Sequence, residues 1–267
     1  MRCDYHIHSS ISADSSTRPE LQVKQAEALG LEEICFTEHL EIHFYRGDAW
    51  HVNVAEYREQ FRRLASDRVK LKFGVEAGIA LASEHFPELE GELRAADFDF
   101  VLASAHSIDN IDPFDPRFFE GKTLEQVFRN YIASILAGLK QLNTELFSSV
   151  GHIDFPSKGA HSEEDARLFY RYAADEIDTL FRYLIAQGKC IEINTASYRQ
   201  LNGLAIPGED WLRRYAQLGG EYVTLGSDAH SPEFIAYRLE EATEMAKRAG
   251  IKYYATYEQM VPVFHKL

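Results

Sequence analysis

Residues 3–40 have the sequence CDYHIHSSISADSSTRPELQVKQAEALGLEEICFTEHL, and this stretch contains the repeating unit of the fold. The apolar runs 3–7 and 33–37 have the length and composition of buried strands. Between them lie the start and stop signals of a helix, namely a candidate N-cap at Ser15, Ser16 or Thr17, then Pro19, and finally Gly30. A strand, a helix and a second strand in this order predict a βα unit of a parallel sheet.

The same alternation continues to the end of the chain. Strands are expected at 3–7, 33–37, 69–75, 98–103, 147–151, 190–194 and 222–226, with a weaker eighth candidate at 252–256 that is either a barrel strand or an edge. Further helices are expected at 54–65, 123–142, 162–187, 208–218 and 232–249. Because no linker-like or low-complexity tract interrupts the pattern, we expect one domain over residues 1–267. The pattern favours an α/β fold of the (β/α) barrel type, and a doubly wound open sheet is the alternative.

The composition excludes several kinds of protein. Hydrophobic residues make up 45% and charged residues 26% of the 267 residues, and no apolar run approaches the roughly 20 residues of a membrane span. A formal net charge of -14 would repel nucleic acid and anionic membranes, so neither is expected as a partner. Residues 1–6 contain no apolar segment, so we expect no signal peptide and a cytoplasmic location. No pattern in the sequence predicts an oligomeric state.

The three cysteines, Cys3, Cys35 and Cys190, each fall within an expected strand. Their number is odd and none of them forms a C-x-x-C pair, which does not favour a disulfide framework. We expect buried, reduced thiols.

Six of the eleven histidines stand at or just beyond the end of an expected strand, where barrel enzymes form their active sites. His6 and His8 are two residues apart, so both imidazoles can point to the same side of the first strand and reach one metal ion. Asp228 and His230 repeat this spacing after the seventh strand. The complete set of ligand-type side chains at this rim is His6, His8, Asp14, His39, Glu76, His106, His152, Asp228 and His230.

Nine ligands suffice for two or three divalent ions, given three or four protein ligands per ion and one bridging carboxylate. All nine offer nitrogen or oxygen donors, which suits Zn, Mn or Fe and requires no thiolate. The sequence alone does not choose among these metals. A cluster of cations would also attract an anionic substrate to a protein of net negative charge.

These residues resemble the PHP (polymerase and histidinol phosphatase) family, and within it the histidinol-phosphate phosphatases. The resemblance covers nearly the whole chain. It is carried by the segments 4–8 (DYHIH), 36–39 (FTEH), 73–76 (FGVE), 105–109 (AHSID), 151–154 (GHID), 191–195 (IEINT) and 226–230 (GSDAH). The resemblance implies a distorted seven-stranded (β/α) barrel of TIM-like type, in agreement with the strand count.

The resemblance also implies how the ligands are shared among three metal ions. His6, His8, Glu76 and Asp228 match the family's first metal site, Glu76 with His106 and His152 its second, and Asp14, His39 and His230 its third. Glu76 would then bridge two ions. Asp14 stands where some members of the family have histidine.

Three further residues are candidates for contacts with the substrate. Lys158 and Arg199 lie where the phosphatases tend to carry basic residues for phosphate, and the alternative for each is a solvated loop cation. His43 lies in the long loop after the second strand, where it would contact the organic leaving group or remain a surface residue.

The implied activity is metal-dependent hydrolysis of a phosphate monoester, L-histidinol phosphate, to L-histidinol and phosphate in histidine biosynthesis. Arg199 would neutralise phosphate oxygens, and Asp228 or His230 would manage the proton of the leaving group. One alternative is a phosphoesterase of the same family that acts on another phosphomonoester, a nucleotide or a phosphodiester. A non-catalytic metal-bearing module is the third interpretation, but it requires missing ligands, and all nine are present.

Overall fold

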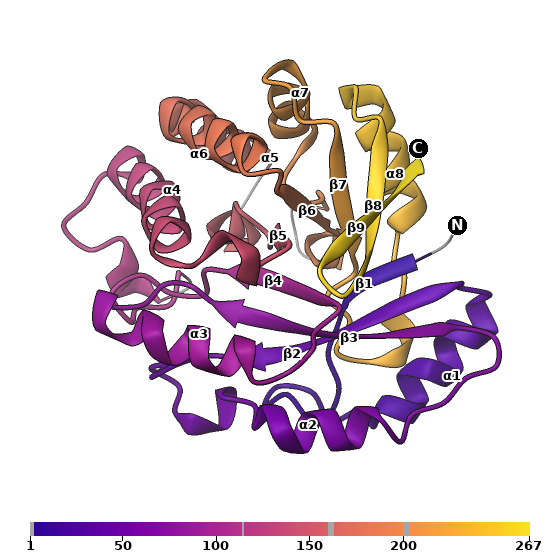
Figure 1. Ribbon diagram of the computed structural model, residues 1–267. Helices are drawn as coiled ribbons and strands as arrows, with labels where there is room; N and C mark the ends of the chain where they lie inside the picture. Colours follow the sequence, from indigo (N-terminus) through magenta and orange to yellow (C-terminus); the bar gives the residue numbers. More distant parts are fainter. Residues whose placement is uncertain (1–2, 114, 160–162, 200–202) are drawn as a thin grey trace.

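A computed structural model describes the protein over residues 3–113, 115–159, 163–199 and 203–267. Figure 1 shows a strongly curved sheet whose outer side is covered by helices. Its strands are β1 (Cys3–Ile7), β2 (Glu33–Leu40), β3 (Lys70–Gly78), β4 (Phe100–Ser104), β5 (Ser149–Val150), β6 (Cys190–Asn194), β7 (Tyr222–Gly226), β8 (Tyr253–Glu258) and β9 (Val261–Lys266).

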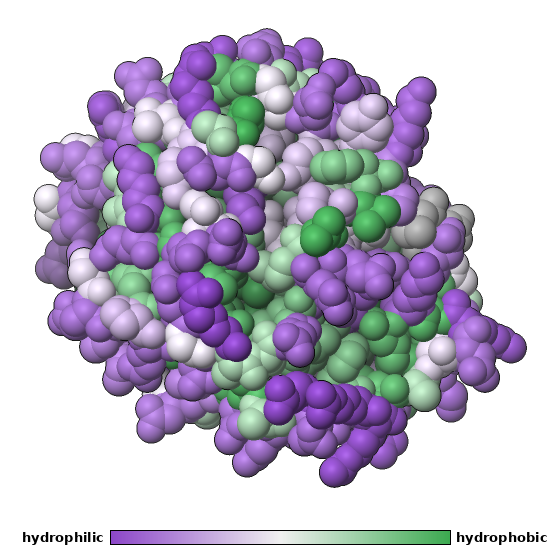
Figure 2. Space-filling model, in the orientation of Figure 1, coloured by the Kyte–Doolittle hydropathy of each residue, from purple (hydrophilic) through white to green (hydrophobic). Residues whose placement is uncertain are grey.

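The α-helices are α1 (Pro19–Leu29), α2 (Val54–Phe61), α3 (Phe86–Arg94), α4 (Leu124–Gln141), α5 (Glu163–Tyr172), α6 (Ala174–Ala186), α7 (Glu209–Gln217) and α8 (Leu239–Ala249). Short 3₁₀ helices are η1 (Asp48–Trp50), η2 (Ser83–His85), η3 (Pro116–Phe118), η4 (Thr144–Leu146), η5 (Phe155–Gly159), η6 (Ala196–Arg199) and η7 (Pro232–Phe234). In the space-filling view of Figure 2, hydrophilic side chains cover most of the periphery of the face shown, and hydrophobic ones gather toward its middle.

Within the described residues the sheet has nine strands in chain order, β1 to β9. Neighbours from β1 to β8 are parallel, and β8 and β9 are antiparallel. The segment after β7 also returns to β1: Ile7 and Ala229 form a parallel bridge, and the amide of His8 donates to the carbonyl oxygen of Ala229 at 2.9 Å. The carboxyl ends of β1 and β7 therefore lie side by side.

The seven strands expected from the sequence are present, and the chain has two more. The weaker candidate at 252–256 is β8, which pairs with β7 on one side and with β9 on the other. β9 was not expected. β2 and β3 extend past their predicted ends to Leu40 and Gly78, so that the candidate ligands His39 and Glu76 lie within the strands.

Three predicted helices are wrong in their extent. The helix expected at 54–65 ends at Phe61. The single helix expected at 162–187 is divided into α5 and α6, because Ala173 leaves the helical conformation with φ -109° and ψ 20°. The helix expected from residue 232 begins only at Leu239, because Ala236 and Arg238 have φ of 55° and 54° in the left-handed region, which interrupts a right-handed helix. Helix α3 was not predicted.

Helix α1 begins and ends with the predicted proline and glycine. Gly30 has φ 67°, and its amide donates to the carbonyl oxygen of Glu27. The predicted N-cap is wrong, since Arg18 occupies that position without a side-chain cap. The hydroxyls of Ser15 and Thr17 instead donate to the carbonyl oxygen of His230 at 2.8 and 3.1 Å, so they hold the loop after β7 against the loop after β1.

The β8–β9 hairpin packs against the amino-terminal side of the sheet. The amide of Tyr257 donates to the hydroxyl of Tyr5 at 2.7 Å, and the Tyr257 hydroxyl donates to the carbonyl oxygen of Ser148 at 3.3 Å. At the hairpin turn, the amide of Met260 donates to the carbonyl oxygen of Asp99 at 2.9 Å. The end of the sheet opposite the candidate ligands is therefore closed by protein.

Two expectations from composition can be compared with the structure. All three cysteines are buried and free, as predicted. Among the helices of the described ranges, none combines the length and the hydropathy of a membrane span.

Candidate metal centre

The nine predicted ligands come from the carboxyl ends of six strands and from the loop after β1, and the structure brings all nine together. They form four overlapping groups in which the candidate ligand atoms lie within 4.8 Å of one another. The groups are His8, Asp14, His39 and His230; His6, His8 and Asp228; His6, Glu76 and His152; and His39, Glu76 and His106. Parallel strands end at the same edge of the sheet, which explains why residues distant in sequence meet there.

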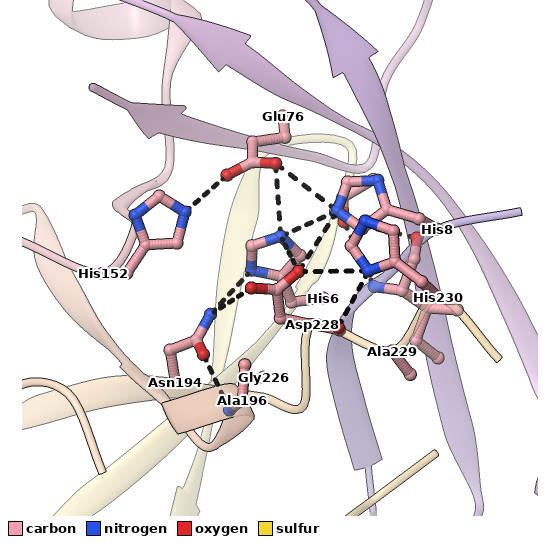
Figure 3. Close-up of polar contacts among 12 residues, drawn as sticks. His6, His8, Glu76, His152, Asn194, Ala196, Gly226, Asp228, Ala229 and His230 are labelled. Atoms are coloured by element: carbon pink, nitrogen blue, oxygen red, sulfur yellow. Dashed lines mark hydrogen bonds and ion pairs between the residues drawn. The ribbon is translucent and has the colours of Figure 1, made fainter. Parts of the chain in front are cut away.

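The residues of the predicted first metal site, His6, His8, Glu76 and Asp228, lie between β1, β3 and β7. Nε2 of His6 and Nε2 of His8 are 3.0 Å apart. Oε2 of Glu76 lies 3.3 Å from the first and 3.4 Å from the second. Oδ1 of Asp228 lies 3.7 Å from both. Figure 3 shows these four side chains pointing toward one another.

The other ligands of the predicted second metal site, His106 and His152, lie on the other side of the Glu76 carboxylate. Oε1 of Glu76 is 2.9 Å from Nε2 of His152 and 3.1 Å from Nε2 of His106. The two imidazole nitrogens are 3.3 Å apart. Each oxygen of Glu76 thus faces a different group of ligands, as a bridging carboxylate requires, and Figure 3 shows His152 and His6 on either side of it.

The residues of the predicted third metal site, Asp14, His39 and His230, lie nearest to the solvent. Oδ2 of Asp14 is 2.9 Å from Nε2 of His230 and 3.4 Å from Nε2 of His39. Nδ1 of His39 is in turn 3.2 Å from Oε2 of Glu76, so His39 connects this group to the first. The rings of His8 and His230 stack at 4.4 Å, which brings the edges of the two groups together.

The spacing of these donors fits divalent transition metals. Bonds of 2.0–2.1 Å in a tetrahedral arrangement place neighbouring ligand atoms about 3.3 Å apart. The separations of 2.9–3.7 Å among these donors lie close to that value. Nitrogen and oxygen donors without a thiolate are also the set expected for Zn, Mn or Fe.

A second layer of side chains orients the histidines. Nδ1 of His6 is 2.6 Å from Oε1 of Glu192, and Nδ1 of His106 is 2.5 Å from Oε1 of Glu41. Nδ1 of His8 is 3.2 Å from the hydroxyl of Ser12. Such partners fix the tautomer and the direction of a ligating imidazole.

Sequence reasoning gave no role to Glu41, Glu192 or Ser12. A signal was present for one of them, since Glu192 and Asn194 are two residues apart on a strand and therefore point to the same side. Asn194 donates to Oε2 of Glu192 at 3.2 Å and to Oδ2 of Asp228 at 3.3 Å. The sixth strand thus supports the ligands without contributing one.

Two glycines make room for these carboxylates. A Cβ at Gly226 would overlap the Glu192 carboxylate and the Cβ of His6, and a Cβ at Gly78 would overlap the Glu41 carboxylate. Close approach, rather than φ, is the reason for glycine at both positions. Asp228, by contrast, has φ 54°, a conformation that Asp adopts more readily than most residues and that turns the chain back toward β1.

The buried carboxylates and imidazoles strongly affect one another's pKa. Burial raises the pKa of Glu76, but the charges of His106 and His6 outweigh it and hold the pKa well below its usual value. Burial likewise lowers the pKa of His106, while Glu76 and Glu41 raise it to about 10. The centre therefore requires positive charge around Glu76, which protons or metal cations can supply.

The structure places the three predicted substrate contacts in different surroundings. Nη2 of Arg199 donates to the carbonyl oxygen of Asp228 at 3.2 Å, and the guanidinium carbon lies 4.3 Å from the ring centre of Phe234. Its Nη1 is buried and has no hydrogen-bond partner within the described ranges. The backbone of Lys158 belongs to η5, but its side chain lies outside the described residues.

His43 is not brought to the metal centre. Its Nε2 is 2.9 Å from Oε2 of Glu88, and its ring lies 4.3 Å from that of His85. It lines a separate cavity beside Ile79 and Ile108. The structure therefore gives His43 partners that the sequence did not suggest.

One cavity of about 280 Å³ opens onto the candidate ligands. Asp14, His39, Glu76, His106, His152, Asp228 and His230 line its inner part, and Phe44, Tyr45, Arg46, Trp50, Asp112 and Phe155 line the remainder. Its volume lies near the lower end of the roughly 300–1,000 Å³ of small-molecule sites, which favours a small substrate.

Comparisons with known proteins agree with this chemistry. A family model described as PHP domain matches residues 4–196. A protein named histidinol-phosphatase from Lactococcus lactis subsp. lactis (strain IL1403) is 34% identical over 267 residues, which cover 97% of this chain and 95% of that protein.

Solved structures show the same similarity. The crystal structure of histidinol phosphate phosphatase from Lactococcus lactis subsp. lactis Il1403, complexed with Zn, L-histidinol and phosphate, is 31% identical, covers 98% of each chain and superposes with a TM-score of 0.82. A chain from Listeria monocytogenes, 18% identical, with 90% of this chain and 99% of that chain covered and a TM-score of 0.67, supports the fold alone.

Proposed function

The chain belongs to the PHP domain family, and we propose that it is a metal-dependent phosphatase that hydrolyses L-histidinol phosphate to L-histidinol and phosphate in histidine biosynthesis. The observation that carries this proposal is the convergence of nine ligand-type side chains, seven of which line one small cavity. The similarity to a histidinol phosphate phosphatase that binds Zn, L-histidinol and phosphate supports the substrate.

The proposed centre holds two to three ions of Zn, Mn or Fe. His6, His8, Glu76 and Asp228 hold the first, Glu76, His106 and His152 the second, and Asp14, His39 and His230 the third. When bound, these ions supply Lewis-acid charge to phosphoryl oxygens and lower the pKa of water. Glu192, Glu41 and Ser12 keep the ring nitrogens of His6, His106 and His8 pointed into the centre.

Arg199 is the proposed phosphate contact. Burial lowers the pKa of its guanidinium, yet the group remains charged because the usual pKa of arginine is above 12. Its buried Nη1 lacks a partner among the described residues, and a phosphate oxygen reaching past Asp228 would provide one. Lys158 is the second candidate.

The proton of the leaving group is assigned to Asp228 or His230. Nδ1 of His230 is 3.1 Å from the carbonyl oxygen of Asp228, and its Nε2 faces Asp14. His230 is the most exposed histidine of the centre.

The remaining features of the proposal concern the whole chain. Residues 1–267 form a single domain in which β1 to β7 make a distorted seven-stranded barrel of TIM-like type. The segment after β7 contacts β1, and the β8–β9 hairpin is added beside β7. The protein acts in the cytoplasm on a small phosphate ester, without nucleic acid or membrane as a partner.

The first prediction is the substrate preference. Release of inorganic phosphate is measured from L-histidinol phosphate and p-nitrophenyl phosphate, and conversion of a cyclic nucleotide to the nucleoside monophosphate is followed by chromatography, with metal content determined on the same preparation. We expect kcat/KM for L-histidinol phosphate to exceed that for p-nitrophenyl phosphate by about 10²-fold, because a site that hydrogen-bonds the leaving group discriminates strongly.

Two results would contradict this proposal. A preference for the cyclic nucleotide would identify a phosphodiesterase on the same metals. Absence of hydrolysis of every ester, with two or more equivalents of metal bound, would identify a non-catalytic module.

A further inference from the structure

Three side chains at the outer end of the metal cavity form a compact group that the metal ligands do not include. Tyr45 and Arg46 lie in the loop after β2, and Asp112 lies in the loop after β4. The Tyr45 hydroxyl and Nη2 of Arg46 both donate to Oδ2 of Asp112 at 2.6 Å. Nε of Arg46 also donates to the Tyr45 hydroxyl at 2.8 Å.

The guanidinium group of Arg46 occupies a position suited to any cation. Its carbon lies 5.1 Å from the ring centre of Trp50 and 5.6 Å from that of Tyr45. Cations bind favourably over aromatic faces, and a carboxylate beside them adds a charge-assisted hydrogen bond. Asp112 with the two aromatic rings therefore forms a cation-binding position at the mouth of the cavity.

This position lies on the cavity that contains the proposed metal centre. Asp112, Trp50 and Glu76 all line it. The Trp50 ring is 4.8 Å from that of His39, so the aromatic wall directly contacts a candidate ligand.

The carboxylates that line the cavity indicate a function for Asp112. Four carboxylates line the cavity, and three of them, Asp14, Glu76 and Asp228, belong to the proposed metal sites. Asp112 is the remaining one among the described residues. In L-histidinol phosphate the ammonium stands on the carbon next to the CH2–O–P group, so a phosphate bound at the metals holds the ammonium in the same small cavity, which Asp112 also lines.

We propose that Asp112 determines specificity by binding the primary ammonium of the leaving group, and that Arg46 occupies this cation position until the substrate arrives. This inference rests on the proposed function and extends it. The Arg46 side chain is 46% exposed, and an ion pair with so exposed a partner is weak, so a bound substrate can displace the guanidinium. The Asp112 side chain is 14% exposed and keeps its position through Tyr45.

The second prediction tests Asp112 with the metal-loaded enzyme. Asp112→Asn keeps the size of the side chain and removes its charge. We expect KM for L-histidinol phosphate to rise at least about 10-fold, with kcat/KM for p-nitrophenyl phosphate unchanged within about twofold, because only the first substrate carries an ammonium. For an analogue of L-histidinol phosphate in which hydrogen replaces the amino group, wild type and Asp112→Asn should have the same KM.

Asp115→Asn is the matched control. Asp115 lies three residues further on, pairs with Arg117 at 2.6 Å and does not line the cavity. Its variant should keep wild-type KM for all three esters. Calorimetric binding of L-histidinol to the metal-loaded proteins gives a readout without turnover, and Asp112→Asn should weaken it at least about 10-fold while inorganic phosphate binds as before.

Arg46→Met tests the second half of the inference. Removing the resident cation should leave p-nitrophenyl phosphate turnover within about twofold and lower KM for L-histidinol phosphate, because the cation position is then open. A loss of turnover on both esters would place Arg46 on the phosphate instead and overturn its assigned role.

The outcomes separate this inference from the proposed function. If wild type prefers L-histidinol phosphate and Asp112→Asn keeps its KM and its affinity for L-histidinol, the inference about Asp112 is wrong and the function stands. If wild type hydrolyses p-nitrophenyl phosphate and shows no preference for L-histidinol phosphate, the proposed substrate is wrong, and so is the inference that depends on it.

Discussion

Five imidazole groups surround the carboxylate of Glu76. Three of them, from His6, His8 and His39, lie 3.2–3.4 Å from Oε2. The other two, from His106 and His152, lie 3.1 and 2.9 Å from Oε1. Glu76 is 1% exposed, so its charge is compensated almost entirely by these neighbours and by the ions they are proposed to hold. The shape of the centre thus depends on one residue of β3.

The third prediction concerns Arg199, which belongs to none of the metal groups. If its guanidinium binds the phosphoryl group, Arg199→Ala should lower kcat/KM by about 10²-fold, or roughly 2.7 kcal/mol of transition-state stabilisation, without changing metal content. Arg199→Lys should recover only part of this loss, because an ammonium cannot make a two-point contact. Steady-state kinetics with elemental analysis of each variant provides the measurement.

Retention of kcat/KM within about threefold in Arg199→Ala would be no more than the effect of an ordinary surface substitution. Arg199 would then only support the loop through the Asp228 carbonyl, and Lys158 would become the candidate for the phosphate contact.

Among the elements, helix α4 shows how the outer layer holds the site. The Tyr131 hydroxyl of α4 donates to the carbonyl oxygen of Ala105 at 2.8 Å, next to His106. The helix begins with a capping box, in which the Thr123 hydroxyl accepts from the amide of Gln126 at 3.2 Å and the Gln126 side chain accepts from the amide of Thr123 at 2.9 Å. A local sequence signal at residue 123 therefore stabilises an element that packs directly behind the centre.

The fourth prediction is that Thr123→Ala destabilises the protein by about 1 kcal/mol, because the amide of Gln126 loses the hydroxyl that accepts its hydrogen bond. For a chain of this size, Tm should fall by about 2–4 °C in differential scanning fluorimetry. Activity at low temperature should not change, since Thr123 does not contact the cavity.

Thr179→Ala is the control at the same scale. Thr179 lies on the exposed side of α6, and its hydroxyl bonds to the carbonyl oxygen of Asp175 at 2.8 Å, a contact that contributes little to a helix. Equal Tm values for Thr123→Ala and Thr179→Ala would show that the capping box does not stabilise α4.

At the scale of the whole molecule, the centre concentrates negative and titratable groups inside a protein whose formal net charge is already -14. Cations bound at the proposed centre would oppose this charge and connect side chains from six strands of the sheet, so they would stabilise the folded state at the same place where they are proposed to serve catalysis.

The fifth prediction is that removal of metal lowers Tm. Ions present at about 100 times their Kd stabilise the folded state by about 2.7 kcal/mol per site, which corresponds to a Tm shift of about 5–10 °C for a chain of this size. Tm is measured before chelation, after chelation and after addition of Zn, Mn or Fe. The Glu76→Gln variant should show a much smaller response. An unchanged Tm in a preparation that has lost two or more equivalents would argue against a structural contribution of the ions.

The sequence alone determined the strand–helix alternation, the seven strands from β1 to β7 and the nine ligand-type residues at their ends. These features follow from local rules: burial sets the composition of a strand, its period of two places His6 and His8 on one side, and Pro19 and Gly30 delimit a helix within a few residues. The local signals failed where conformation depends on the surroundings, as at Ala173, Ala236 and Arg238, whose residue types do not announce a break in a helix.

The tertiary structure alone decided which distant side chains meet. It paired His106 with Glu41 and His6 with Glu192, gave His43 the partners Glu88 and His85, and brought Asp112 to Arg46. It also added β9 beside β8. These contacts depend on the curvature of the sheet and on the paths of long loops, and neither is encoded in the period or composition of a short segment. The sequence therefore identifies the candidate metal ligands. Only the folded chain determines which side chains orient them and which side chains line the rest of the cavity.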